Sequence, residues 1–302
     1  MNKNAYLLLS LAALFWAGNA VAGKLAIGHV SPLLLNFLRW AIAAAALAAL
    51  FHPQLRRDWP VLRENIWLLL LLGAFGFTGF SATLYMAVEY TSVINVSIEQ
   101  AAMPMLVFLA NFLLFRMRVS WAQIAGFLLS MAGVAVTASH GDLTRLLELQ
   151  VNFGDALMLV GVTFYGLYTV ALRFKPQVDW RSLMFALTCA AALAGLPFAL
   201  WELAAGRALA PDATGWGLVA FIGLFPSLLS QAFYIRGIEL IGSNRGGLFM
   251  NLVPIFGIVL SILIVGETFH AYHAVAMLMV FGGIWLAEQG GRRRTEETDT
   301  RR

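Results

Sequence analysis

The stretches TGFSATLY at 78–85 and SLLSQAFY at 227–234 are two copies of one pattern, 149 positions apart in the chain. Each copy has hydroxyl residues at its first and fourth positions and a tyrosine at its eighth. This spacing places the three polar side chains on one face of an α-helix. The same offset relates further pairs: Phe15-Trp16 and Phe164-Tyr165, Lys24 and Arg173, Asn95 and Asn244 and, after a slip of one residue, Pro104 and Pro254, and Gly133 and Gly283. The sequence therefore predicts an internal repeat.

The composition is that of a membrane protein. Of the 302 residues, 60% are hydrophobic and 12% are charged, and the mean hydropathy is +0.78. A helix needs about 20 mostly apolar residues to cross the hydrocarbon core of a bilayer. Runs of suitable length lie near 5–27, 32–51, 66–88, 92–115, 120–139, 154–173, 181–201, 215–237, 244–265 and 270–288. We therefore expect an all-α integral membrane protein with ten transmembrane helices.

The ten predicted spans divide into two repeats of five. Because five is an odd number of crossings, the second copy must be inverted in the membrane relative to the first. Many secondary transporters use inverted repeats to build two alternating gates around one midplane site. We expect the first repeat at 1–148, the inverted second repeat at 149–289 and a disordered cytoplasmic tail at 290–302.

The basic residues predict the orientation of the spans. If the N-terminus is inside, the inner loops collect most lysines and arginines, whereas the outer loops keep only Arg145 and Arg207. Such an excess of positive charge is typical of cytoplasmic loops. We expect a multi-pass protein of the bacterial inner (cytoplasmic) membrane with both termini in the cytoplasm. The net charge of +4 then reflects topology and does not call for a nucleic-acid partner.

Polar and aromatic residues inside the apolar runs are candidates for a substrate pathway, because a polar group in hydrocarbon must face a partner or a wet cavity. Aromatic rings near the middle of a span offer stacking and cation–π surface to amphipathic solutes. Helix packing by small hydroxyl residues, an interfacial aromatic belt and core packing by methionine are the alternative roles. The candidate pathway residues are Trp16, Asn19, Thr78, Ser81, Glu99, Met103, Tyr165, Tyr168, Ser227 and Gln231.

Arg39 and Glu99 are the charged residues with the highest cost of burial. Each lies seven residues into a span that begins outside, and so about 10 Å below the outer surface. An isolated buried charge needs a partner or water. Their matching depth favours an Arg39–Glu99 ion pair, with Lys24 as a competing partner. A structural pair, a gate and recognition of a substrate ammonium group are the roles that remain open.

Several motifs in both halves resemble one transporter family. The run from Asn251 and Pro254 to Gly266-Glu267, followed by Gly282-Gly283, is similar to the C-terminal signature of EamA-type exporters in the drug/metabolite transporter superfamily. Its first-half counterpart runs from Pro104 to Phe115, Gly126 and Gly133, with Met117 where the second half has Glu267; Arg39 also matches an arginine common in the family. The chain looks most like YddG-type amino-acid exporters. The resemblance implies ten helices, an inverted repeat and export of amino acids or small metabolites.

We expect a secondary transporter that exports neutral or aromatic amino acids, or related small metabolites, by alternating access. A multidrug or metabolite exporter and a non-transporting receptor or scaffold are the alternatives. The sequence has no nucleotide-binding motif, no H-E-x-x-H and no G-x-S-x-G, so we expect neither an enzyme nor a cofactor. One cysteine, Cys189, excludes a multi-cysteine metal site, and His270 and His273 lack further ligands nearby, so we expect no metal. The expected partners are a small-molecule substrate and the lipid bilayer.

Overall fold

The computed structural model describes residues 3–116, 120–142, 152–241 and 247–299, and every regular element within these ranges is helical. The elements of the first half are α1 (Lys3–Leu25), α2 (Pro32–Glu64), α3 (Ile66–Leu72), η1 (Gly73–Gly79), α4 (Phe80–Tyr90), α5 (Val93–Ala101), α6 (Met103–Phe115) and α7 (Trp121–Ala138). Those of the second half are α9 (Phe153–Ala171), η2 (Leu172–Phe174), α10 (Trp180–Ala204), α11 (Ala213–Leu224), η3 (Phe225–Leu229), α12 (Ser230–Ile241), η4 (Gly247–Asn251), α14 (Leu252–Leu260), η5 (Ser261–Val265) and α15 (Ala271–Asp299).

These elements make up the expected set of membrane spans. In the described part of the chain, 8 continuous helical segments are long and apolar enough to cross a bilayer, and two shorter apolar helices, Phe249–Val265 and Ala271–Ala287, complete the set. Several spans are assembled from consecutive elements: α3, η1 and α4 form one, and α11, η3 and α12 form another. The predicted fold class, an all-α multi-pass membrane protein, is confirmed.

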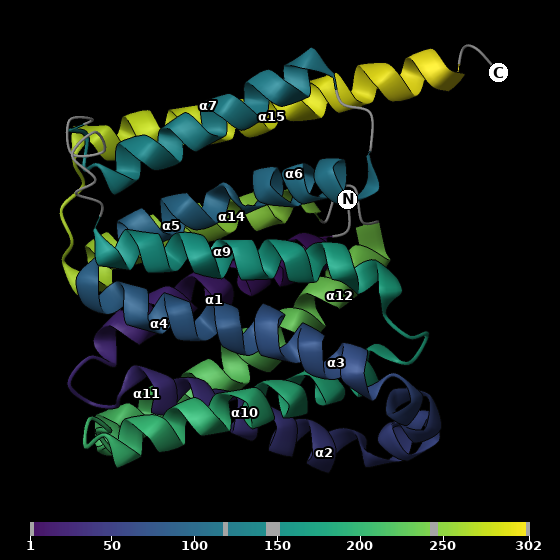
Figure 1. Ribbon diagram of the computed structural model, residues 1–302, viewed down its shortest axis with the longest axis vertical. Helices are drawn as coiled ribbons and strands as arrows, with labels where there is room; N and C mark the ends of the chain where they lie inside the picture. The colour runs from purple at the N-terminus through teal and green to yellow at the C-terminus, as the bar shows by residue number, and fades with distance from the viewer. Residues whose placement is uncertain (1–2, 117–119, 143–151, 242–246, 300–302) are drawn as a thin grey trace.

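The helices lie side by side with their axes roughly aligned, and the two ends of the chain point to the same side of the bundle (Figure 1). Packing partners follow the repeat: α1 packs on α12, and its counterpart α9 packs on α4. The pairs α2–α10 and α7–α15 each join equivalent spans of the two halves and lie at opposite edges of the bundle (Figure 1). Each of these contacts between the halves therefore has an equivalent contact when the two halves are exchanged.

Small residues allow the last spans of the two halves to approach closely. A Cβ atom added to Gly126 of α7 would lie 2.4 Å from the carbonyl oxygen of Gly283 on α15. One added to Gly133 would lie 2.8 Å from the carbonyl oxygen of Ala276. Lipid is as apolar as a leucine side chain, so close backbone packing of this kind is a main source of association between membrane helices.

The repeated hydroxyl pattern coincides with π-helical turns in both halves, η1 and η3. Pro226 has no N–H to donate to the carbonyl of Ile222, the residue four positions earlier. The hydroxyl of Ser227 donates to that carbonyl instead, at 2.8 Å. One turn later, the hydroxyl of Ser230 donates to the carbonyl of Phe225 at 3.1 Å. Hydroxyl side chains thus satisfy backbone groups that a proline and a widened turn release inside the membrane.

Two predicted boundaries differ from the structure. The second span was expected to end near residue 51, but α2 continues through a kink at Phe51 (φ −126, ψ 21) as far as Glu64. The tail at 290–302 was expected to be disordered, but α15 continues as a helix through residue 299. Arginine and glutamate, which favour helix, occur in both extensions, and Pro53 and Pro60 lie inside α2 without ending it.

Candidate functional site

Arg39 lies in the centre of a cluster of neutral polar side chains. Its side chain projects from α2, is only 4% exposed and donates to the hydroxyl oxygen of Ser227 on η3, at 3.2 Å from Nε and 2.8 Å from Nη2. The Nη1 group donates to the Asn19 side-chain oxygen on α1 at 3.2 Å and to the hydroxyl oxygen of Tyr85 on α4. Tyr85 donates in turn to Asn19 at 2.8 Å. We call Arg39, Asn19, Tyr85 and Ser227 the arginine cluster.

The predicted ion pair between Arg39 and Glu99 does not form. The partners found for the guanidinium within the described ranges are neutral oxygens, and both carboxyl oxygens of Glu99 lack a hydrogen-bond partner there. Lys24, the competing partner, donates to the carbonyl oxygens of Val88 and Thr91 at the end of the third span. Equal depth in the membrane does not bring two side chains together when their helices present them to different neighbours.

An aromatic cluster lies beside the arginine cluster. Trp16 of α1 meets Tyr234 of α12 edge to face, with ring centroids 5.3 Å apart. Tyr165 of α9 packs against Phe80 of α4 at 5.0 Å and against Tyr168 at 5.3 Å, and it lies near Tyr234. The two clusters are joined through η3, because the indole N–H of Trp16 donates to the carbonyl oxygen of Pro226 at 3.1 Å, next to Ser227 in the chain.

A small cavity of about 10 Å³ opens beside Trp16, where α1, α5 and α14 meet. Its lining residues are Trp16, Ala17, Ala20, Ser97, Gln100, Val253 and Pro254. This volume is enough for about one water molecule. One predicted pathway residue, Trp16, therefore lies on the wall of this cavity.

The other predicted pathway residues occupy different surroundings. Thr78 donates to the carbonyl oxygen of Ala191 on α10 at 2.6 Å, and Ser81 donates to the side-chain oxygen of Asn36 on α2 at 2.6 Å. The structure brings these two hydroxyls into contact with α10 and α2. Met103 packs against the apolar core around α1 and α4, and Gln231 is half-buried on α12.

Glu99 has an acidic neighbour that the sequence analysis missed, Asp155 on α9. Both side chains are 0% exposed. Asp155 accepts hydrogen bonds from the Thr91 hydroxyl and, at 3.4 Å, from the Asn95 amide, while its second oxygen has no partner among the described residues. The sequence did carry a signal, because Asp155 is an acidic residue inside the predicted span 154–173.

Two glutamates cap helices from other spans at the end of the bundle that the sequence predicts to face outward. Glu267 accepts from the backbone N–H groups of Val93 and Ile94, at 2.8 Å and 3.1 Å, and so caps α5. Glu202 accepts from the hydroxyl of Ser31 at 2.6 Å and from the N–H of Leu34 at 3.0 Å, and so caps α2. A carboxylate at a helix N-terminus satisfies free N–H groups and complements the helix dipole.

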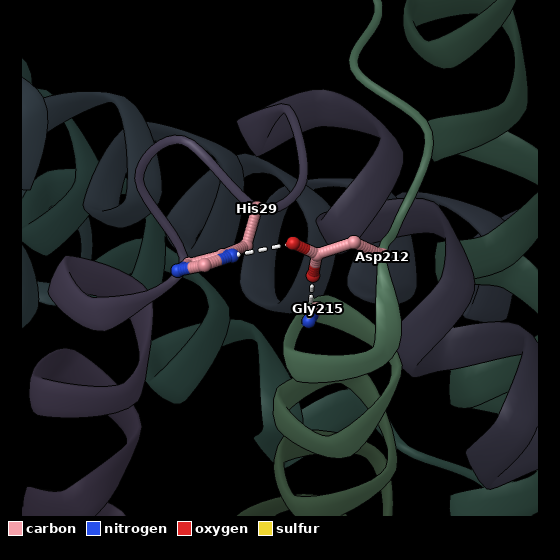
Figure 2. Close-up of polar contacts among 3 residues, drawn as sticks. All are labelled: His29, Asp212 and Gly215. Carbon is pink, nitrogen blue, oxygen red and sulfur yellow. Dashed lines mark hydrogen bonds and ion pairs between the residues drawn. The ribbon is translucent and has the colours of Figure 1, made fainter.

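A third acidic residue links two loops that the sequence predicts to face outward. Asp212 caps α11 by accepting from the Gly215 N–H at 2.7 Å, and its other oxygen lies 2.8 Å from Nδ1 of His29 (Figure 2). The Gly215 hydrogen bond, followed by the contact with His29, lowers the pKa of Asp212 below its usual value. The loop after α1 is thereby tied to the start of α11.

Matches to known proteins cover nearly the whole chain. The model of the EamA-like transporter family matches residues 3–139 and again residues 152–288, once in each predicted repeat. The chain belongs to the EamA-like transporter family. Within the described ranges, no group of three or more His, Cys, Asp or Glu side chains is arranged to hold a metal ion.

Two proteins named as transporters are similar to this chain over most of their length. The uncharacterized transporter YetK of Bacillus subtilis is 26% identical over 93% of this chain and 86% of its own. A probable terminal-alkyne amino-acid exporter of Streptantibioticus cattleyicolor is 26% identical over 97% of both chains. A solved crystal structure matches with a TM-score of 0.61 at 24% identity and covers 97% of this chain and 99% of its own, which shows a shared fold alone.

Proposed function

We propose that this EamA protein is a secondary transporter that exports neutral amino acids, aromatic ones in particular, by alternating access. The observation that carries the proposal is the arginine cluster beside the aromatic cluster. Arg39 is a buried cation whose partners among the described residues are neutral, and Trp16 is connected to it through consecutive residues of η3. The arginine cluster is suited to bind the carboxylate of an amino acid, and the aromatic cluster is suited to contact the side chain of the same molecule.

The chemistry of Arg39 favours a carboxylate ligand. A guanidinium group presents paired N–H donors that fit a carboxylate in bidentate geometry. Neutral oxygens satisfy its hydrogen bonds but do not compensate its charge, and a buried charge without a counter-charge is costly. A substrate carboxylate that displaces Ser227 or Asn19 supplies the missing charge, so binding relieves a cost already present in the empty protein.

The aromatic cluster provides the contacts for the side chain of the substrate. The faces of Trp16, Tyr165 and Tyr234 offer apolar contact and stacking surface together with polar edges. A surface of this kind also suits amphipathic drugs or metabolites that have no carboxylate, which is the competing function. The relative from Streptantibioticus cattleyicolor is named as an amino-acid exporter, which supports the first alternative.

The same proposal includes the location of the protein in the cell and the division of the chain into two repeats. We place the protein in the inner membrane of a bacterium with both termini in the cytoplasm, because the arginines gather in the loops of one side. We assign the repeats to residues 1–148 and 149–289. The relatives are named transporters, and we assign no catalytic reaction to this chain.

Counterflow in proteoliposomes tests the substrate class. Vesicles loaded with unlabelled phenylalanine should accumulate labelled phenylalanine, and phenylalanine amide, which lacks the carboxylate, should compete at least about tenfold more weakly, a difference of about 1.4 kcal/mol. In Arg39→Lys, which keeps the charge but loses the paired donors, this discrimination should shrink. Equal competition by the amide in the wild type would show that a carboxylate is not recognised and would favour the drug or metabolite exporter.

A further inference from the structure

Glu99 and Asp155 are buried acids without a compensating charge among the residues that the structure describes. Both are 0% exposed, and in the described part of the chain three of their four carboxyl oxygens have no hydrogen-bond partner. An ionised carboxylate buried in this way has lost its water and has gained nothing in return. At least one of the two groups must therefore be neutral in this conformation.

The two carboxyl groups belong to one site. Asn95 precedes Glu99 by four residues on α5, so the two side chains lie one above the other on the same helix face. The Asn95 amide reaches Asp155 at 3.4 Å, and α5 packs on α9. Glu99 thus lies one turn deeper than the contact with Asp155, and the two carboxyl groups are close enough to repel each other when ionised.

The titratable groups around this pair do not neutralise it. On α1, the Lys24 ammonium is bound to two backbone carbonyls and lies in the field of Glu267 and Glu89. On α4, the Tyr85 hydroxyl belongs to the arginine cluster. His273 on α15 contacts Asn95. His140, just after the end of α7, interacts electrostatically with Asp155. The sequences of α6 and α14 contain no titratable side chain.

A chain of hydrogen bonds connects Asp155 to the outer end of the bundle. Asp155 accepts from Asn95, whose side-chain oxygen lies 3.2 Å from Nε2 of His273. Nδ1 of His273 accepts from the backbone N–H of His270 at 3.0 Å, and the exposed ring of His270 contacts Thr268 at 3.1 Å. This chain orients one oxygen of Asp155 and holds the pair against the outer ends of α5 and α15.

We propose that Glu99 and Asp155 form a proton-binding site, in which Glu99 takes up a proton from outer water while the outer end is open, holds it while both groups are buried, and releases it to inner water when the inner end opens. Binding forms an O–H bond on a carboxyl oxygen of Glu99 with a proton from water, and release returns that proton to water. Asp155 keeps a negative charge more easily than Glu99 does, because Thr91 and Asn95 donate hydrogen bonds to its carboxylate. The ligand of the site is therefore the proton.

The role of this site in coupling rests on the transport function proposed above, whereas the protonation state itself does not. If a proton taken up outside must be bound before the outer end closes, and must leave to the inside before the outer end opens again, proton entry is linked to substrate exit. Substrate and protons then move in opposite directions across the membrane. The arginine cluster selects the substrate, and the acidic pair couples its export to the proton gradient.

Infrared spectroscopy of the purified protein in lipid tests the protonation state without any transport. The wild type at neutral pH should show the C=O stretching band of a protonated carboxyl group. Glu99→Gln should remove the band, and Asp155→Asn should keep it, because Glu99 then remains buried without a counter-charge. Glu239→Gln, a change of an exposed acid on α12 that pairs with Arg236, is the matched control. A wild type without the band, or a band that survives Glu99→Gln, overturns the proposal.

Flux in proteoliposomes tests the coupling. A proton gradient should drive uphill movement of substrate in the wild type and in Glu239→Gln, but in Glu99→Gln only counterflow exchange should remain. A wild-type flux that ignores the gradient overturns the coupling role. If the wild type exchanges no amino acid at all, the proposed transport function fails instead, while the infrared band still decides whether the proton site exists.

Discussion

The indole N–H of Trp16 donates a hydrogen bond to the carbonyl oxygen of Pro226, at 3.1 Å. This bond links the first span of one repeat to the π-helical turn of the other, immediately before the serine that holds Arg39. It connects the ring that we assign to substrate contact with the backbone that positions the charged group. A movement of η3 during transport would therefore change the positions of side chains in both clusters.

Replacement of Trp16 by Phe keeps an aromatic ring but removes this donor. The carbonyl of Pro226 loses its indole donor, so the free energy of unfolding should fall by about 1–2 kcal/mol, and the apparent affinity for substrate should weaken. Thermal unfolding in detergent and counterflow measure the two effects. Trp121→Phe, at a tryptophan that is 86% exposed on α7, is the control and should change neither quantity. Equal behaviour of the two variants would contradict a positioning role for Trp16.

Replacement of Glu267 by Gln should loosen the outer end of the bundle. Gln retains one acceptor but loses the charge and one of the two bonds to α5, which should cost about 1 kcal/mol and favour an outward-open state. On a Cys189→Ala background, a cysteine placed at the buried Ala22 should react faster with a hydrophilic thiol reagent in this variant. The Glu239→Gln control should leave the reaction rate unchanged. An unchanged rate in Glu267→Gln would show that the cap does not seal the outer end.

Asp212 predicts a small dependence of stability on acid pH. Its pKa is lowered in the folded protein, mainly by the Gly215 N–H and then by His29. A lowered folded-state pKa means that the carboxylate stabilises the fold above its unfolded pKa, near 4, and that this contribution is lost as the pH falls through the folded value. Asp212→Asn retains the helix cap but removes the charge. As the pH falls below about 4, the melting temperature of this variant should therefore fall less than that of the wild type. Parallel curves of melting temperature against pH for the two proteins would contradict the assignment.

The glycine contact between α7 and α15 predicts a large packing effect. In Gly126→Ala, the new Cβ would lie 2.4 Å from the carbonyl oxygen of Gly283, so the helices must separate, at a cost of about 1–3 kcal/mol. Gly217 of α11 has no atom within 4 Å of an added Cβ. Gly217→Ala should therefore be neutral or slightly stabilising. Thermal unfolding of both variants measures the difference, and equal melting temperatures would argue against close packing of α7 on α15.

Reporter fusions test the orientation. Fusions after Arg57 and Arg181 should show cytoplasmic activity, and a fusion near Asp212 should show external activity, because the arginine-rich loops are retained inside. A reversed pattern at these positions would contradict the assigned orientation, although the packing of the two repeats would remain as described.

The sequence by itself determined the ten spans, the duplication and the family, because hydrophobic length and repeated residues are local properties of the chain. It also indicated that Arg39, Glu99 and Trp16 need special surroundings, since their depth follows from their distance to the nearest span end. It did not determine their partners. A change in the rotation of a helix alters the neighbour of a side chain without altering its depth, and packing against other spans sets that rotation. Only the tertiary structure therefore decided that Arg39 meets Asn19, Tyr85 and Ser227 instead of Glu99, and that Glu99 lies near Asp155.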